Sequence, residues 1–518
     1  MSEMEARICG SLQNTSGYTS LYRLRQKPAP FRNQRGGIAV ITAIMIMGLV
    51  GICGLALDLG LIYNRKVELR NVANAAALGA AKKLNGTPSG INVAVAAAAS
   101  AVAALKYQYD TTAFSWSDSA IKFSTSPDPQ GAWVDAGTAA ATPGRFYYVR
   151  VRTDQLPDAG NVRTLLMGVV SPDFVTVTVA SEATAGRATI DAAPLAVCAM
   201  SNTPNSSRAN PPGPPELVQY GFRRGVSYDL NNLAPTGVAP VSRANFLVNP
   251  LAQPGTPGSA ADAQPASVGP YVCTGTLGIP RITGDTIAVV PAFPLASLYK
   301  QLNSRFDQYA DGLCNFHAAP PDVNVKSYFS SAIPWMTIPP SPTSQQTALC
   351  NGGAAGVTCT APGRTKLQTI ADLPAPGGPA AQYGPVWAYA KAVPFTTYSP
   401  GVPEPLPNGY TTFTTASWSS LYGGQTSVGY PGGSSTPYKA LTGVNFSAPS
   451  AAHRPGAKGR RVLNVPLLDC APMPSNSAIV LAIGKFFMTV PATANTLAAE
   501  FAGAVPVDSI GGKVELFP

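Results

Sequence analysis

Cysteine and histidine side chains are the first residues in this sequence whose types and spacing suggest chemistry. Cys314 and His317 stand in the sequence CNFH, a spacing found among zinc ligands. A structural zinc site takes about four ligands, whereas the chain has only 2 histidines, His317 and His453. Thiols of an exported protein also tend to oxidise before they coordinate a metal. We therefore expect no metal site.

Catalysis is not indicated by any motif. A serine nucleophile needs a histidine as its base, and His453 lies in AAHRPGAKGRR, a basic, turn-like stretch typical of solvated surface. The sequence has no G-x-S-x-G elbow, P-loop or G-x-G-x-x-G loop. Acidic residues are few, so no pair of carboxylates stands out. We expect no catalytic residues and no cofactor; an exported enzyme with a histidine-centred cleft remains an alternative.

The 8 cysteines fall into two groups along the chain. Cys9 and Cys53 lie in the first 57 residues, and the others are Cys198, Cys273, Cys314, Cys350, Cys359 and Cys470. An even number of cysteines in an exported segment favours disulfides, here three, in pairings that the spacing does not rank. Cys350 and Cys359 would close the shortest loop.

Composition describes a long, loop-rich chain whose positive charge is concentrated at one end. A length of 518 residues allows two or three domains, and 49 Gly and 50 Pro require many turns. Segment 1–35 has six basic residues against Glu3 and Glu5, which leaves 30 basic and 24 acidic residues for the other 483 positions. The remainder is nearly neutral and has no basic stripe interleaved with aromatic residues, so we expect no nucleic-acid partner.

Residues 36–57 have the composition of a membrane span. They read GGIAVITAIMIMGLVGICGLAL, without an ionisable side chain other than the thiol of Cys53, and a helix needs about 20 such residues to cross the hydrocarbon layer. A buried core helix is the alternative, but core helices rarely run so long without a polar face. We expect a transmembrane helix that contacts membrane lipid.

The flanking charges predict the direction of this span. Five basic residues lie at 23–35, ending with Arg35, whereas Arg65 and Lys66 on the other side lie farther away and are offset by Asp58. Positive charge is retained in the cytoplasm, so segment 1–35 should be a basic cytoplasmic tail and the bulk of the chain should be exported. A cleavable signal sequence is the alternative. It is disfavoured because the helix continues past Asp58 without a small-residue cleavage motif.

The pattern after the span predicts an α+β domain over residues 58–190. One helix should run from about residue 38 to 84 and become amphipathic beyond Asp58, and a second should cover about 92–107. FSWSDSAIKFS, RFYYVRVRTD and FVTVTVASEATA have the alternating character of strands, with VRTLLMGVV as a short helix between the last two. The amphipathic half should therefore pack on a small antiparallel sheet.

Composition changes again after residue 190. Of the 50 prolines, 42 lie in segment 191–518, which excludes long helices from most of it. TIAVV at 286–290 predicts a strand, ASLYKQLNSRFDQY at 296–309 a helix, and SAIVLAIGKFFMTVP a late pair of buried strands. We expect a Pro/Gly-rich, mainly β domain with disulfides.

Residues 35–84 resemble the N-terminal segment of TadE/TadG-like proteins of the tight-adherence (Flp pilus) machinery. The resemblance is carried by Arg35-Gly36 at the start of the span, by GLALDLG with Asp58, by Tyr63 with Arg65 and Lys66, and by the Ala-rich run from Asn71 to Ala81. It extends loosely to residue 190. It implies an inner-membrane component that works beside a secretion ATPase, a secretin and pilins.

Two departures from related proteins limit what the resemblance implies. No DxSxS motif of a von Willebrand-type domain is present, and the fifth residue after Gly36 is Ile41, where processed pilins carry Glu. Pilin-type cleavage is therefore not expected.

Small residues suggest how the helix could assemble with others. Ala39 with Ala43, and Ala56 with Gly60, are small-x-x-x-small pairs that allow another helix to approach closely, or are simply compatible with lipid. Asp58 should mark the outer membrane boundary, most simply as a residue facing water.

These features together predict a non-enzymatic, membrane-anchored protein of Flp pilus assembly. Its helix would dock among pilus subunits or pilins, as a homo- or hetero-oligomer, and its exported domain would contact partners. An adhesin or envelope-binding protein, with a ligand held by residues 191–518, is the alternative from another functional class.

Overall fold

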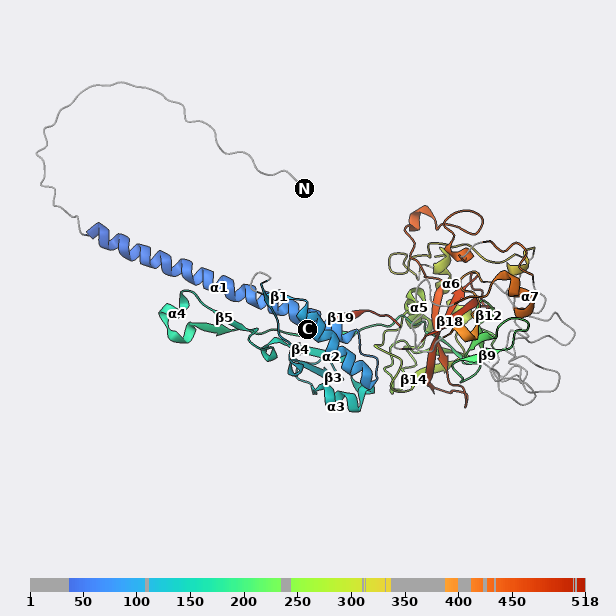
Figure 1. Ribbon diagram of the computed structural model, residues 1–518, viewed down its shortest axis with the longest axis horizontal. Coiled ribbons are helices and arrows are strands. Elements are labelled where there is room, and N and C mark those ends of the chain that lie inside the picture. Colours follow the sequence, from blue (N-terminus) through green and yellow to red (C-terminus); the bar gives the residue numbers. More distant parts are fainter. Residues whose placement is uncertain are drawn as a thin grey trace, which may run out of the picture. The chain divides into compact units, whose positions relative to one another are not determined.

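A computed structural model describes residues 37–107, 111–233, 244–309, 312, 314–330, 332–336, 387–398, 411–422, 426–432, 435–505, 507 and 510–517 (Figure 1). Two compact units make up this part of the chain. The first contains residues 37–60 and 164–175, and the second contains the remaining described residues. The fold is α+β, as the sequence predicts, with one long apolar helix followed by a mostly β body.

The long helix α1 spans Gly37–Ala81, three residues short of its predicted end. Its apolar residues up to Leu59 are largely exposed, whereas Leu69, Val72, Ala73, Ala76, Ala77, Ala80 and Ala81 are buried. These buried side chains recur at steps of three and four, so they form one stripe along the helix. The predicted change from an apolar to an amphipathic helix is confirmed.

Helix α2 spans Pro88–Ala103, about four residues earlier than predicted. Thr87 caps it, because its side chain accepts a hydrogen bond from the amide of Gly90 at 3.0 Å, and Pro88 occupies the first turn. Segment 85–90, which reads NGTPSG, therefore contains the start of this helix. Lys106 and Tyr107, predicted as helix, form the short strand β1 (Lys106–Tyr107), which pairs with β2 (Thr112–Ala113).

The predicted antiparallel sheet is present and packs on the amphipathic half of α1. Its order is β19-β7-β4-β3, from Val514–Phe517, Glu182–Arg187, Tyr148–Arg152 and Ile121–Ser124. Ile121, Phe123, Val149, Val151 and Ala185 from these strands are buried in one cluster with the apolar stripe of α1 and with α2. We refer to this cluster and its elements as the small domain.

The segment between β4 and β7 differs from its prediction. Val162 and Arg163 belong to strand β5 (Asn161–Arg163), and only Met167–Val170 form the short helix α4. Strand β6 (Thr176–Thr178) pairs with β5, so the predicted third strand is divided between β6 and β7. This hairpin carries residues 164–175, which we call the finger, at its tip.

Residues 191–510 build a lobe around an eight-stranded sheet. Its order is β12-β18-β17-β15-β8-β13-β14-β16, from Ser227–Asp229, Ala498–Val505, Val480–Met488, Val462–Leu468, Leu195–Cys198, Asn245–Val248, Ile287–Pro291 and Ser477–Ala478. Only the pairing of β15 with β8 is parallel in this sheet as described. The predicted strand at 286–290 is confirmed, and the predicted late pair is the long β17 preceded by the two-residue β16.

Shorter elements complete the lobe. A three-stranded sheet has the order β11-β10-β9 (Phe222–Arg223, Glu216–Gln219, Ser206–Arg208), and the helices are α5 (Pro265–Thr274), α6 (Leu295–Asn303) and α7 (Trp418–Leu421). The predicted helix at 296–309 is confirmed as α6 followed by the 3-10 turn η5 (Ser304–Phe306). Trp335, Trp387 and Trp418 are fully buried within this core.

Candidate functional site

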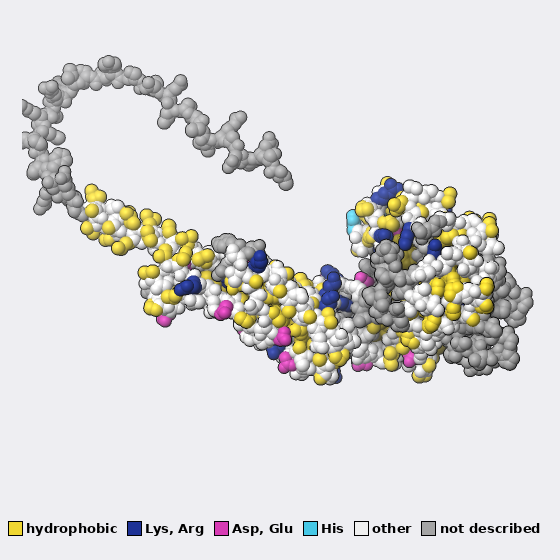
Figure 2. Space-filling view, viewed as in Figure 1, with side chains coloured by type: hydrophobic (Ala, Val, Ile, Leu, Met, Phe, Trp, Pro, Cys, Tyr) yellow, Lys and Arg dark blue, Asp and Glu magenta, His cyan; other side chains and the backbone are white. Residues whose placement is uncertain are grey.

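The N-terminal half of α1 exposes an almost continuous apolar surface (Figure 2). Its exposed large side chains are Ile38, Val40, Ile41, Ile44, Met45, Ile46, Met47, Leu49, Val50, Ile52, Leu55, Leu57 and Leu59. In the described part of the chain this is the one helix long and apolar enough, by length and composition, to cross a membrane, with a mean hydropathy of 2.6 in its most apolar window. Water is a poor solvent for such a surface.

Asp58 lies at the end of this surface and holds the finger. Its carboxylate accepts three backbone hydrogen bonds, from Leu165 at 2.6 Å, Leu166 at 2.8 Å and Met167 at 2.6 Å. Met167 is the first residue of α4, and Leu165 and Leu166 precede it; the first amides of a helix have no partners within that helix. Asp58 is fully buried, so the expectation that it simply faces water is wrong. Backbone donors from the finger replace the water that a carboxylate would otherwise need.

Gly54 lets the finger approach the helix. It lies one turn before Asp58 and therefore on the same face of α1. A Cβ at Gly54 would overlap the side chain of Leu166, so only glycine allows this packing without a shift. In Figure 1, α4 lies beside α1.

The finger itself presents apolar side chains outward. Val169 is 81% exposed and Leu165 is 65% exposed, and Phe174 and Val175 are also exposed. The finger thus extends the apolar surface of α1 sideways at the level of Gly54 and Asp58.

Arg65 anchors the following part of α1 within the small domain. Its guanidinium donates to the carbonyl of Ala159 at 3.0 Å, pairs with Glu68 at 3.3 Å and lies 4.0 Å from the centre of the Tyr107 ring. Arg65 is buried, and it lines an open cavity of about 340 Å³. Lys66 is exposed.

The small residues singled out in the sequence all lie at the surface of α1. Ala39, Ala43, Ala56 and Gly60 are exposed, and nothing lies within 4 Å of a Cβ placed on Gly60. Ala56 and Gly60 follow Gly54 and Asp58 by two residues each, which turns them by about 200° at 3.6 residues per turn. This pair therefore points away from the finger. Arg35 lies outside the described residues.

Four of the six cysteines predicted to form disulfides are paired. Cys198 on β8 is bonded to Cys470, and Cys273 on α5 is bonded to Cys314. Cys350 and Cys359 lie outside the described residues, so their predicted pairing stays a prediction. Because Cys314 is in a disulfide, its thiolate is not free to bind a metal beside His317.

The two histidines do not form a hydrolase site. Nδ1 of His453 contacts both the Ser450 hydroxyl, at 3.1 Å, and the carboxylate of Asp307. A catalytic triad uses the two different ring nitrogens for these two partners, so this arrangement lacks the geometry of a relay. His317 stacks on Phe316 with ring centres 3.9 Å apart. Among the described residues no group of three or more His, Cys, Asp or Glu side chains could hold a metal ion.

Sequence reasoning missed Gly54 and the finger. A small residue one turn before Asp58 was a readable signal, since both positions share a helix face. Most of the finger lies in VRTLLMGVV, which was predicted as a short helix, and that pattern did not indicate that Leu165 and Val169 would be exposed.

Comparison with known proteins gives one match. Residues 36–83 match the sequence model of the Flp pilus-assembly TadE/G-like family (Tad). The matched segment coincides with α1 and the two residues after it, and therefore includes the exposed apolar surface, Asp58 and the buried stripe. No curated protein and no solved structure matches the chain.

Proposed function

We propose that this chain is a non-enzymatic component of Flp pilus assembly, anchored in the inner membrane by the first half of α1. The observation that carries the proposal is the coincidence of the family match at 36–83 with the helix whose apolar side chains are exposed. Gly37 to Leu57 would span about 32 Å at about 1.5 Å per residue. This length fits a hydrocarbon layer of about 30 Å.

Asp58 and the finger would lie at the outer edge of the membrane. A carboxylate within lipid is costly unless it is paired, and here three backbone amides accompany it. The outward Leu165 and Val169 would then enter the interfacial layer beside the helix. The basic residues at 23–35 favour a cytoplasmic location for segment 1–35, and the small domain and the lobe would then be periplasmic.

Docking to pilins or other pilus subunits would use the face of α1 opposite the finger. Ala56 and Gly60 are exposed there and allow a second helix to approach closely. The finger covers the face with Gly54 and Asp58, so that face is already occupied within the chain. The lobe would contact further partners in the periplasm.

Site-specific photocrosslinking in cells tests this docking. Gly60→Leu should leave the chain folded, because no atom lies within 4 Å of its Cβ position, yet it should reduce crosslinks to pilus subunits several-fold and lower piliation. Gly48→Leu is a matched control, since its Cβ position is equally open. Unchanged crosslinking and normal pili for Gly60→Leu would contradict helix docking.

Deletion of the protein separates assembly from adhesion. Loss of pili, seen by electron microscopy and restored by the full chain, is the expected result. Normal pili with lost attachment would instead favour the adhesin alternative.

A further inference from the structure

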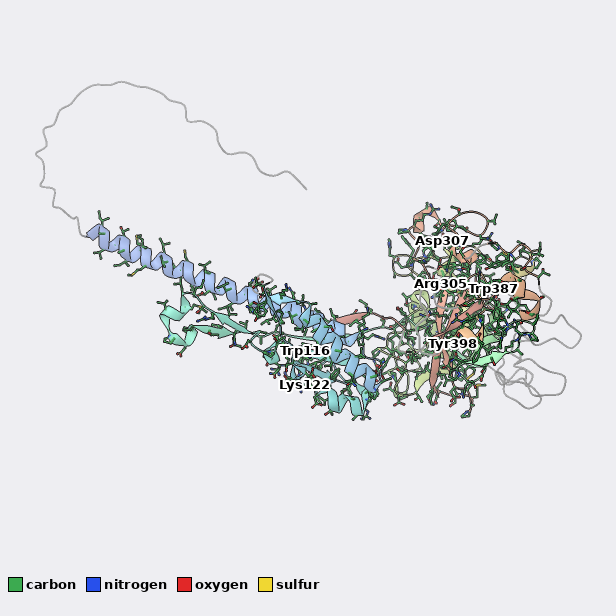
Figure 3. The ribbon with its side chains drawn as sticks, viewed as in Figure 1. Trp116, Lys122, Arg305, Asp307, Trp387 and Tyr398 are labelled. Carbon is green, nitrogen blue, oxygen red and sulfur yellow. A yellow bond between two sulfur atoms is a disulfide. The ribbon has the colours of Figure 1, made fainter. Side chains whose placement is uncertain are left out.

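One cavity in the lobe contains a buried arginine for which the described residues supply no anionic partner. The cavity has a volume of about 240 Å³ and opens between the end of α5, the turn η5 and the start of β15. Its polar lining includes Arg305, Arg460, Lys458, Asp191, Thr274 and Asn464. Arg305 is labelled in Figure 3.

Arg305 is 1% exposed, and its guanidinium makes few hydrogen bonds to the described residues. Nη1 makes one long hydrogen bond, 3.4 Å, to the carbonyl of Leu302, and Nε is buried without a partner among the residues that the structure describes. No described carboxylate lies within ion-pair distance of it. Nη2 lies beside Gly275, where a Cβ would come within 2.8 Å of that nitrogen. Because Gly275 lines the cavity, its missing side chain leaves Nη2 of Arg305 facing the cavity.

Neighbouring charges make the environment more positive. Arg460 extends into the same cavity, although its three nitrogens are already bonded to the carbonyls of Pro320, Thr274 and Cys273. Lys458 is exposed at the opening. Burial first, and then the charge of Arg460, lower the pKa of Arg305 well below its usual value. Since arginine does not lose its proton in proteins, the unbalanced charge calls for an anion.

We propose that this cavity binds a small carboxylate anion, of the size of one sugar acid. The Nε and Nη2 edge of a guanidinium matches the two oxygens of a carboxylate, and in Arg305 this edge has no described partner. The volume is below the range of about 300 to 1,000 Å³ that takes drug-sized ligands. Asp191 and Asn464 at the rim supply oxygen acceptors for hydroxyl groups. Asp191 is exposed, and water screens its repulsion of the bound carboxylate.

The test measures binding of glucuronate to the full-length protein in detergent. Equilibrium dialysis with radiolabelled glucuronate should give about one site per chain, and glucuronate should raise the melting temperature at constant ionic strength. Glucose, which lacks the carboxylate, should do neither.

Two variants decide whether Arg305 holds the anion. Arg305→Met should reduce affinity at least tenfold and abolish the thermal shift. Lys458→Gln, on the surface and therefore harmless to folding, should weaken binding several-fold. Lys439→Gln, at another exposed lysine, should bind like the parent.

Three results would overturn the proposal. The first is that the parent protein does not bind glucuronate, and the second is that it binds glucose equally well. The third is that the Arg305→Met and Lys458→Gln variants bind glucuronate with the same affinity as the parent protein. A purely structural role for Arg305 would lower the stability of Arg305→Met without any dependence on glucuronate.

Discussion

The two disulfides should stabilise the lobe by amounts that follow from the loops they close. Cys273 and Cys314 are 41 residues apart, which corresponds to about 4 kcal/mol of lost unfolded-state entropy. Cys198 and Cys470 are 272 residues apart, which corresponds to about 5.5 kcal/mol. With an unfolding entropy of about 2.1 cal/mol/K per residue over roughly 320 residues, these values predict falls in melting temperature of about 6 and 8 °C.

Thermal unfolding of paired cysteine-to-alanine variants tests these magnitudes. Cys273→Ala with Cys314→Ala removes the shorter loop, and Cys198→Ala with Cys470→Ala removes the longer one. Cys53→Ala is the control, because Cys53 is a free, exposed cysteine on α1 and should leave the melting temperature unchanged. Peptide mapping without reduction should find both bonds in the full-length protein purified in detergent.

Two outcomes would refute this reasoning. Mapping that joins Cys198 to any cysteine other than Cys470 would show that the pairing is wrong. If both disulfides are paired as described but their removal does not lower the melting temperature, then loop closure does not reduce the entropy of the unfolded chain by the calculated amount.

Three further perturbations have defined outcomes. Burial raises the pKa of Glu500 to about 8, against the opposing effects of the amides of Ala390, Tyr389 and Ala388 and of Arg461. The folded protein then holds a proton that the unfolded chain releases near pH 4.5, so stability should decline as pH rises from about 4.5 to 8. Glu500→Gln should reduce this dependence of the melting temperature on pH. An unchanged dependence would mean that other groups cause it. Arg461→Met should lower the free energy of unfolding of the lobe by at least about 3 kcal/mol in denaturant titrations. The reason is that this fully buried guanidinium donates to the carbonyls of Asn324, Lys326, Met488 and Thr489. A decrease of less than about 1 kcal/mol would be inconsistent with these hydrogen bonds. Asp58→Ala should speed amide exchange at Leu165, Leu166 and Met167 and leave β4 protected, whereas equal exchange in both proteins would mean that the carboxylate does not hold the finger.

Periodicity in the sequence was enough to predict the long helix and the sheet on which it packs. Leu69, Val72, Ala73 and Ala76 recur at helical spacing, so their burial on one face follows from geometry alone. Strand positions in the small domain were also visible, because β-branched and aromatic residues alternate there. The start of α2 was predicted about four residues too late. Thr87 caps this helix and Pro88 occupies its first turn, but the same residues also occur in turns.

Contacts between distant segments could not be predicted from the sequence. Asp58 and Leu165 are 107 positions apart, and no local pattern indicates that this carboxylate accepts amides instead of facing water. Arg305 lies in an ordinary helix-like sequence two residues before Asp307, and only the folded lobe reveals that no described carboxylate forms an ion pair with it. A polar group is buried where tertiary partners satisfy its hydrogen bonds, and a single sequence does not identify those partners.

The C-terminal strand shows how the lobe is joined to the small domain. Strand β19 pairs with β7 through Val514 opposite Arg187. The two connecting segments remain paired as they leave the sheet, because Ala188 donates to the carbonyl of Lys513 at 2.8 Å and Asp191 donates to that of Gly511 at 3.0 Å. A hairpin turn would join two such strands in a smaller protein. The lobe is therefore inserted where a turn would suffice.

Excision of the lobe should leave the small domain folded. Its described buried core contains no residue between Ala185 and Val514, and domains inserted through adjacent ends are the ones that chains tolerate best. The lobe does contribute Arg281, which donates to the carbonyls of Pro143 at 3.1 Å and Phe146 at 2.9 Å, but water can replace these bonds at an exposed surface. Replacing residues 190–511 with Asn-Gly should give a product that resists protease and unfolds cooperatively. Rapid degradation of that product would mean that the sheet needs the lobe, and that the lobe is part of the core of this protein, not an insertion into it.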